Sequence, residues 1–182
     1  MRARKLSVFC LWFVLIVGLV GPSTAEAAQQ PLPPVFTFPG QVIFLGADYN
    51  LWLLNGDTGE RYRLTDDGSD EIRYSSPSFS PDGKKIVYLR WEKSSGTQAI
   101  YLLESGSKAA RIIVAGNWSI SDHPWSPDGK MIIYTNAVMM GSPADPNIAR
   151  GVFIDDLATG QTTMVQQASE HQAFYDAQWS SN

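Results

Sequence analysis

The feature of this sequence that most constrains its fold is an internal repeat. The segment SFSPDGKKIVY at residues 78–88 recurs as PWSPDGKMIIY at residues 124–134, 46 residues further along the chain. The two copies share an aromatic residue, Ser, Pro, Asp, Gly, Lys and Tyr at matching positions. A third start, AQWSSN, lies at residues 177–182, and a degraded copy that lacks the Asp lies at residues 36–45. Such a period predicts a fold built from stacked copies of one small unit.

The segments between these motifs repeat as well. Short strands separated by turns are expected at residues 51–54, 62–65, 100–103, 111–114, 152–154 and 162–165. One unit is therefore four short strands in about 46 residues, which is typical of β-propeller blades. No segment after the N-terminal apolar run shows a long helical period. We predict an all-β fold, a β-propeller of four-stranded antiparallel blades, with about three blades plus a fragment in an incomplete ring.

Several of the expected strands are apolar on both faces. Residues 86–89 read Ile-Val-Tyr-Leu, and residues 42–45 read Val-Ile-Phe-Leu. A strand with one wet face would alternate apolar and polar side chains, whereas a sheet covered on both faces gives continuous apolar runs. We therefore expect both of these strands to be buried on both faces, as in blades that stack on one another.

The Ser-Pro-Asp-Gly motif predicts a tight hairpin turn. Ser80 suits the first position of a type I turn, and Pro81 fixes φ at the second. Asp82 suits the third position, and Gly83 accepts the left-handed conformation that follows. The turn would join the first two strands of a blade. We expect a structural rather than a catalytic role for these residues and for their equivalents in the second copy, which are Ser126, Pro127, Asp128 and Gly129.

At these residues the chain resembles a known repeat family. Residues 79–83 and 125–129 are similar to the signature turn of the TolB-like, WD40-like (PD40-type) β-propeller repeats, and residues 51–83 resemble one complete repeat. The resemblance extends over residues 36–182. It implies a non-enzymatic propeller in the periplasm or cell envelope that binds a ligand or another protein. The loops at the two ends of the ring would be its binding surfaces.

The same resemblance leaves a second function open. Similar blades form the N-terminal propeller of prolyl-oligopeptidase or dipeptidyl-peptidase-like serine hydrolases, whose catalytic domain lies beyond the propeller. This chain contains no Gly-x-Ser-x-Gly nucleophile elbow and no P-loop. We therefore expect no catalytic residue in it, and an enzyme only if it is the first portion of such a hydrolase. The repeat stops at Asn182, where a turn would follow, and we expect further blades beyond it.

The N-terminus has the order of a secretory signal peptide. Arg4 and Lys5 precede an apolar run over residues 6–20, and Ala25 and Ala27 place small side chains where a signal peptidase reads them. The apolar run is short for a bilayer span, which needs about 20 residues. We predict a signal peptide over residues 1–27 that is cleaved after Ala27, which places the mature protein in the periplasm or outside the cell.

The mature chain divides simply. Residues 28–35 form a proline-rich tether, and blades are expected at residues 36–66, 74–115 and 121–166, with the start of the next at 174–182. The sequence has one cysteine, Cys10, which leaves with the signal, so no disulfide is expected. No stable membrane span is expected after cleavage.

The charge of the chain excludes one class of partner. Its formal net charge is −4, from 14 basic and 18 acidic residues, and the predicted signal removes more basic than acidic side chains. Nucleic-acid binding needs clustered Lys and Arg, so we expect no nucleic-acid partner. The expected partner is another protein of the cell envelope. The insertion at residues 136–150 is the loop best placed for partner contacts.

Few residues suggest chemistry. His123 and His171 are the only histidines, and each precedes the first strand of a unit. We interpret His123 as a loop residue between blades, because two histidines are too few for a metal cluster. The acidic run at residues 66–71 lacks the pattern of a calcium loop and is interpreted as a solvated connection. We therefore expect no metal and no cofactor.

Overall fold

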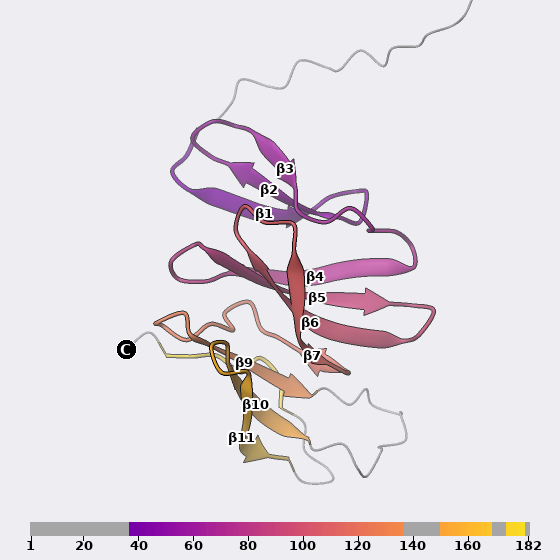
Figure 1. The fold of residues 1–182 in the computed structure, drawn as a ribbon, viewed down its shortest axis with the longest axis vertical. Helices are drawn as coiled ribbons and strands as arrows, with labels where there is room; N and C mark the ends of the chain where they lie inside the picture. The colour runs from indigo at the N-terminus through magenta and orange to yellow at the C-terminus, as the bar shows by residue number, and fades with distance from the viewer. Residues whose placement is uncertain (1–36, 137–149, 169–173, 181–182) are drawn as a thin grey trace, which may run out of the picture. The chain divides into compact units, whose positions relative to one another are not determined.

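The computed structural model describes residues 37–136, 150–168 and 174–180, which belong to one compact unit of residues 36–182. The strands of these residues form three antiparallel sheets, and none of the described residues is helical (Figure 1). The first sheet contains β1 (Gln41–Leu45), β2 (Leu51–Asn55) and β3 (Arg61–Arg63). The second contains β4 (Ile72–Phe79), β5 (Lys85–Glu92), β6 (Thr97–Glu104) and β7 (Ala110–Ala115). The third contains β8 (Trp118–Ser119), β9 (Met131–Asn136), β10 (Gly151–Asp156) and β11 (Gln161–Gln167).

Each sheet is a meander in which consecutive strands pair. The strand orders are β1-β2-β3, β4-β5-β6-β7 and β8-β9-β10-β11, and every pairing is antiparallel. Tight turns suffice for such pairings, in agreement with the turn residues found between the apolar segments. The predicted all-β fold of antiparallel sheets is confirmed.

Several predictions fall outside the described residues. They concern the signal peptide and tether at residues 1–35, most of the insertion at 136–150, and His171. No helix that could span a membrane is found in the part of the chain that the structure describes.

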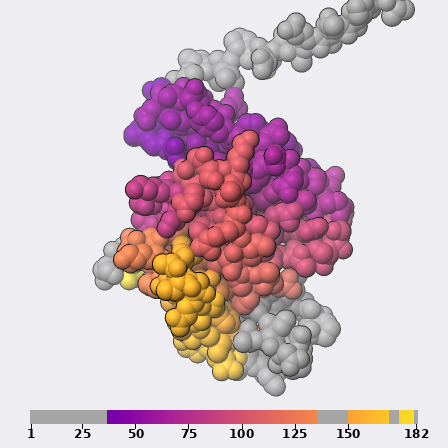
Figure 2. Space-filling view, in the orientation of Figure 1, coloured from indigo at the N-terminus to yellow at the C-terminus, as the bar shows by residue number. Residues whose placement is uncertain are grey.

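The hydrophobic core lies between consecutive sheets. One cluster joins the second and third sheets, and it includes Val87, Ile100, Trp125 and Ile132. A second cluster joins the first and second sheets, and its members are Leu51, Leu53, Tyr74, Ile86, Tyr88 and Leu103. On the face drawn in Figure 2, the atoms of the second sheet lie between those of the first and third. The second sheet is therefore covered on both faces.

The expectation of burial on both faces is right for one strand and wrong for the other. The side chains of residues 86–89 in β5 are at most 6% exposed. In β1, by contrast, Val42 is 43% exposed and Leu45 is 50% exposed. Only Ile43 of β1 packs against the described core. The difference arises because β5 belongs to the sheet that has a neighbour on each side.

The two Ser-Pro-Asp-Gly turns have the same geometry. The Ser80 hydroxyl donates to Asp82 Oδ1 at 2.6 Å and accepts the Lys85 N–H at 2.9 Å, while Gly83 N–H donates to the Ser80 carbonyl at 2.8 Å. In the second copy the three distances recur unchanged. The serine hydroxyl, with a backbone N–H, holds the pKa of Asp82 below its ordinary value. The aspartates are thus engaged in closing the turns.

A substitution at Gly83 is expected to separate backbone strain from crowding. Gly83 has φ 68°, and a Cβ added there would meet no atom within 4 Å. Gly83→Val should therefore lower the free energy of unfolding by about 1–2 kcal/mol through strain alone. Gly83→Asn should cost less, because Asn tolerates the left-handed region. Urea denaturation of both variants checks this, and equal stability of Gly83→Val and the parent chain would contradict it.

Candidate functional site

A row of aromatic side chains crosses the face of the second sheet that packs toward the first sheet. Tyr88 on β5 and Tyr101 on β6 are register partners, with stacked rings 5.6 Å apart and 4° from parallel. Tyr74 on β4 meets the Tyr88 ring edge-on at 5.6 Å. On β7 the row continues with Ile112, the register partner of Tyr101, which is 51% exposed. The row therefore begins in the core at Tyr74 and ends in solvent.

The third sheet repeats this row in a closed form. Tyr134 and Phe153 are register partners with rings 5.8 Å apart and 13° from parallel, and Trp118 lies edge-on to both. Tyr134 is 1% exposed and Phe153 is 7% exposed. They share a cluster with apolar side chains of the second sheet, which are Val87, Leu89, Ile100 and Leu102. Between the second and third sheets, the row is thus part of a packed interior.

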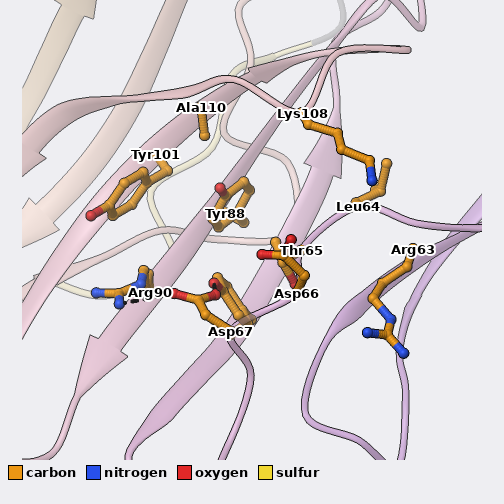
Figure 3. A pocket seen from close by; sticks show the side chains of 11 residues that line it. Arg63, Leu64, Thr65, Asp66, Asp67, Tyr88, Arg90, Tyr101, Lys108 and Ala110 are labelled. Carbon is orange, nitrogen blue, oxygen red and sulfur yellow. Dashed lines mark hydrogen bonds and ion pairs between the residues drawn. The ribbon is translucent and has the colours of Figure 1, made fainter.

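The corresponding place between the first and second sheets is open. It holds a pocket of about 440 Å³ (Figure 3). The last strand of the first sheet, β3, has only three residues, and all of them are exposed. The last strand of the second sheet, β7, has six residues. The short strand leaves Tyr101 half-buried. The lining residues are Arg63, Leu64, Thr65, Asp66, Asp67, Tyr74, Tyr88, Arg90, Tyr101, Lys108 and Ala110.

One wall of the pocket is held by a network around Asp67. The Tyr74 hydroxyl donates to Asp67 Oδ1, and Arg90 Nη2 donates to Asp67 Oδ2 at 3.1 Å. Arg90 also pairs with Glu92 at 3.5 Å. Partial burial alone would raise the pKa of Asp67, but the hydrogen bonds from Tyr74 and Arg90 outweigh it and hold that pKa below its ordinary value. Burial and the Asp67 carboxylate raise the pKa of Tyr74, which stays a neutral donor.

Other charged residues also line the pocket. Arg63 lies 3.6 Å from the Asp48 carboxylate and over the Trp52 ring at 5.2 Å. Lys108 and Asp66 are exposed and make no ion pair with another described residue. Counting Arg90 and Asp67, the lining carries three cations and two carboxylates. Asp48 and Glu92, which are not lining residues, pair with Arg63 and Arg90, so the pocket and its immediate surroundings carry no excess of positive charge.

The residues that the sequence singled out do not form this site. The two aspartates of the repeat turns close their own hairpins, and neither lines the pocket. His123 is exposed, and its backbone N–H donates to the Ser121 hydroxyl at 3.3 Å. Within the described ranges, no group of three or more His, Cys, Asp or Glu side chains could hold a metal ion.

Residues 66–71 form a largely exposed connection between β3 and β4, as interpreted from the sequence, and Asp66, Asp67, Asp70 and Glu71 are all exposed. The sequence did not show that Asp67 is also bound by Tyr74 and Arg90 at the pocket wall. The sequence signals only that a tyrosine recurs at positions 88 and 134 of successive repeats. It does not show that this ring faces residues 64–67, because that depends on the packing of the first sheet against the second.

Replacing Asp67 by Asn is expected to reduce stability in a pH-dependent way. At pH 7 the loss should be roughly 1 kcal/mol, a value discounted because the Asp67 side chain is 47% exposed. The folded pKa of Asp67 is lowered, so its contribution is present above the unfolded pKa and disappears as the pH falls through the folded value. The gap between parent and variant should therefore shrink below about pH 4. Asp66→Asn, the control, should change stability little at either pH; urea melts at both pH values provide the measurement.

Comparison with known proteins gives relatives by sequence and by structure. No family model matches the chain. Over 96 residues it is 27% identical to the uncharacterized peptidase YuxL of Bacillus subtilis, covering 53% of this chain and 14% of the peptidase. Over 64 residues it is 39% identical to dipeptidyl-peptidase 5 of Aspergillus fumigatus, covering 32% of this chain and 9% of the enzyme. The chain thus spans a small part of the curated relatives it matches.

The structural matches are to larger proteins with a shared fold. A proposed TolB from Agrobacterium tumefaciens matches 70% of this chain and 45% of its own, with a TM-score of 0.51 and 19% identity. Dipeptidyl peptidase 4 of Porphyromonas gingivalis matches 73% of this chain and 25% of its own, with a TM-score of 0.53 and 10% identity. Because the sequence identities are this low, the structural matches show a shared fold and nothing about function. The three sheets have the TolB-like β-propeller fold.

Proposed function

We propose that this chain is an exported, non-catalytic binding module that recognises its partner at the pocket between the first and second sheets. The observation that carries the proposal is the contrast between the two aromatic rows. The row of Trp118, Tyr134 and Phe153 is covered by apolar side chains, as a structural row should be. The row of Tyr74, Tyr88 and Tyr101 faces a pocket, with a charged network along its wall.

The composition of the open row supports binding rather than packing alone. Register places Tyr101 where the closed row has Phe153, and both rows use an edge-on ring on the first strand of the sheet. Tyrosine offers a large rigid face together with a polar hydroxyl, which suits a surface that is apolar in part and wet in part. We further propose that the blades are PD40-type repeats and that the partner is a protein of the cell envelope. The turn motifs at residues 79–83 and 125–129 support this assignment.

A second candidate function is favoured by the sequence relatives. YuxL and dipeptidyl-peptidase 5 are both peptidases, and this chain matches a small part of each. Under this alternative, the sheets would be the propeller portion of a longer serine hydrolase, and the pocket would serve substrate access or domain contact. The catalytic groups would then lie outside residues 1–182.

The gene and the mature protein test the two proposals together. We expect the protein isolated from its source to begin at Ala28, because Ala25 and Ala27 follow the charged and apolar segments in order. N-terminal sequencing and intact-mass measurement check this, and an intact Met1 on a membrane-bound product would contradict it. Reading the gene beyond Asn182 separates the functions. Further blades and a stop codon support the binding module, whereas an α/β-hydrolase segment with a nucleophile elbow would select the peptidase.

A further inference from the structure

We propose that β11 pairs edge to edge with the β11 strand of a second copy of this chain, in an antiparallel arrangement that joins two third sheets into one. The proposal does not depend on the pocket or on its ligand. It uses three properties of the strand: its free edge, its lack of charge, and the residue pairs that a two-fold axis would create along it.

The edge of the third sheet at β11 is long and exposed. β11 is the last strand of this sheet, and among the described strands only β10 pairs with it (Figure 1). All seven of its residues are exposed, and the exposed fractions of Met164 and Val165 are 40% and 49%. The outer N–H and C=O groups of an edge strand form a template on which another strand can pair. The third sheet therefore has a free edge of seven residues.

The last strands of the other two sheets carry arginines where β11 has none. Register with the preceding strand aligns Arg-Tyr-Arg at residues 61–63 and Ala-Arg-Ile at 110–112 with Thr-Thr-Met at 162–164. Short length and charged side chains are the usual protection of an edge against pairing. β3 has both, and Arg111 of β7 also donates to the Leu157 carbonyl at 3.1 Å.

The contrast between β7 and β11 lies in charge rather than in strand shape. Both strands contain a register shift, which falls between Ile100 and Tyr101 in one pairing and between Val152 and Phe153 in the other. A bulge of this kind twists an edge, but it is common to the two strands. β11 reads QTTMVQQ and contains no charged residue and no proline. Of the three last strands, β11 is therefore the longest and the least protected.

A second copy fits this edge because β11 is compatible with itself. An antiparallel pair centred on Met164 would place the two Met164 side chains opposite each other, with Thr163 opposite the second copy's Val165 and Thr162 opposite its Gln166. No like charges meet along this pair, although each copy has a formal net charge of −4. An uncharged strand also has nothing with which to select a charged segment of another protein. We therefore assign the edge to a second copy of the chain.

Sedimentation velocity of the full chain over a range of concentrations tests the proposal. The parent chain should show a reversible equilibrium between monomer and dimer. Met164→Lys would place two like charges opposite each other at the centre of the pair and should weaken dimerisation at least about fivefold. Thr163→Arg, which introduces the charge that β7 has at Arg111, should weaken it as well. The matched control is Ile112→Lys, at the equivalent exposed position of β7, which should change dimerisation less than about twofold.

A cysteine at the centre of the pair tests its register. Cys10 is the only cysteine of the chain, so the background for this experiment is Cys10→Ser. Met164→Cys should form a disulfide-linked dimer on air oxidation, because directly opposed residues of paired strands bring their Cβ atoms into disulfide range. Ile112→Cys, the exposed control on β7, should remain largely monomeric.

Circular dichroism shows whether each variant keeps the fold. A parent chain that stays monomeric at every concentration would overturn the proposal. A dimer that survives both Met164→Lys and Thr163→Arg, or cross-linking of Ile112→Cys as complete as that of Met164→Cys, would also overturn it, because the copies would then associate through another surface. Each of these results would leave the proposed binding function standing, since β11 does not line the pocket.

Discussion

Replacing Trp125 by alanine is expected to lower the free energy of unfolding by about 3–5 kcal/mol, because a large buried ring is lost and a cavity remains. Trp125 is 7% exposed and lies in the cluster between the second and third sheets. Its indole Nε1 also donates to the Ser78 carbonyl of the preceding repeat at 3.1 Å. Urea denaturation followed by circular dichroism measures the loss.

Trp125→Phe separates the ring from the hydrogen bond. It keeps most of the apolar surface and removes the indole donor, so it should cost about 0.5–1.5 kcal/mol for the bond plus a smaller packing loss. The same contact recurs one unit further on, where Trp179 Nε1 donates to the Pro124 carbonyl at 3.1 Å. A loss below 1 kcal/mol for Trp125→Ala would mean that these tryptophans do not join successive repeats.

A pair of isoleucines on opposite faces of the second sheet should respond very differently to truncation. Ile100 is fully buried against the third sheet, and Ile100→Ala is expected to cost about 2–5 kcal/mol. Ile112 is 51% exposed and is the register partner of Tyr101, which lines the pocket, and Ile112→Ala should stay within about 0.5 kcal/mol. Thermal or urea melts of the two variants give the comparison. Similar losses at both positions would show that the open row is packed as tightly as the closed one, which would remove the basis for a binding pocket.

The repeat in the sequence was sufficient to predict the sheets but not their differences. The copies at residues 78–88 and 124–134 predicted the hairpins that begin the second and third sheets, and these have matching turn geometry. The exposure of β1 was not predicted, because an apolar run indicates burial only when another sheet lies on each side. That condition depends on a strand's neighbours in space, and the one-dimensional pattern of Val42 to Leu45 does not contain it.

The pocket could be predicted only in part, for a similar reason. Aligned tyrosines at 88 and 134 indicate that a ring recurs at one place in each unit. Whether the row is closed or open depends on the length of β3, which ends at Arg63, and on tertiary contacts around it. Asp67 stands in a run of acidic residues, and nothing local distinguishes it from Asp66. Its partner Arg90 lies 23 residues away in the sequence and is brought near only by the packing of the second sheet.

The openness of the space between the first and second sheets is tested most directly by tyrosine-ring NMR of the full chain with a soluble nitroxide added. Rings labelled with ¹³C report separately on the open row and on the closed row. Tyr101 lines the pocket, so its signals should broaden, whereas those of Tyr134, which is 1% exposed in the closed row, should not. Equal broadening of the two tyrosines, or no broadening of Tyr101, would contradict the proposal that this space is the recognition site.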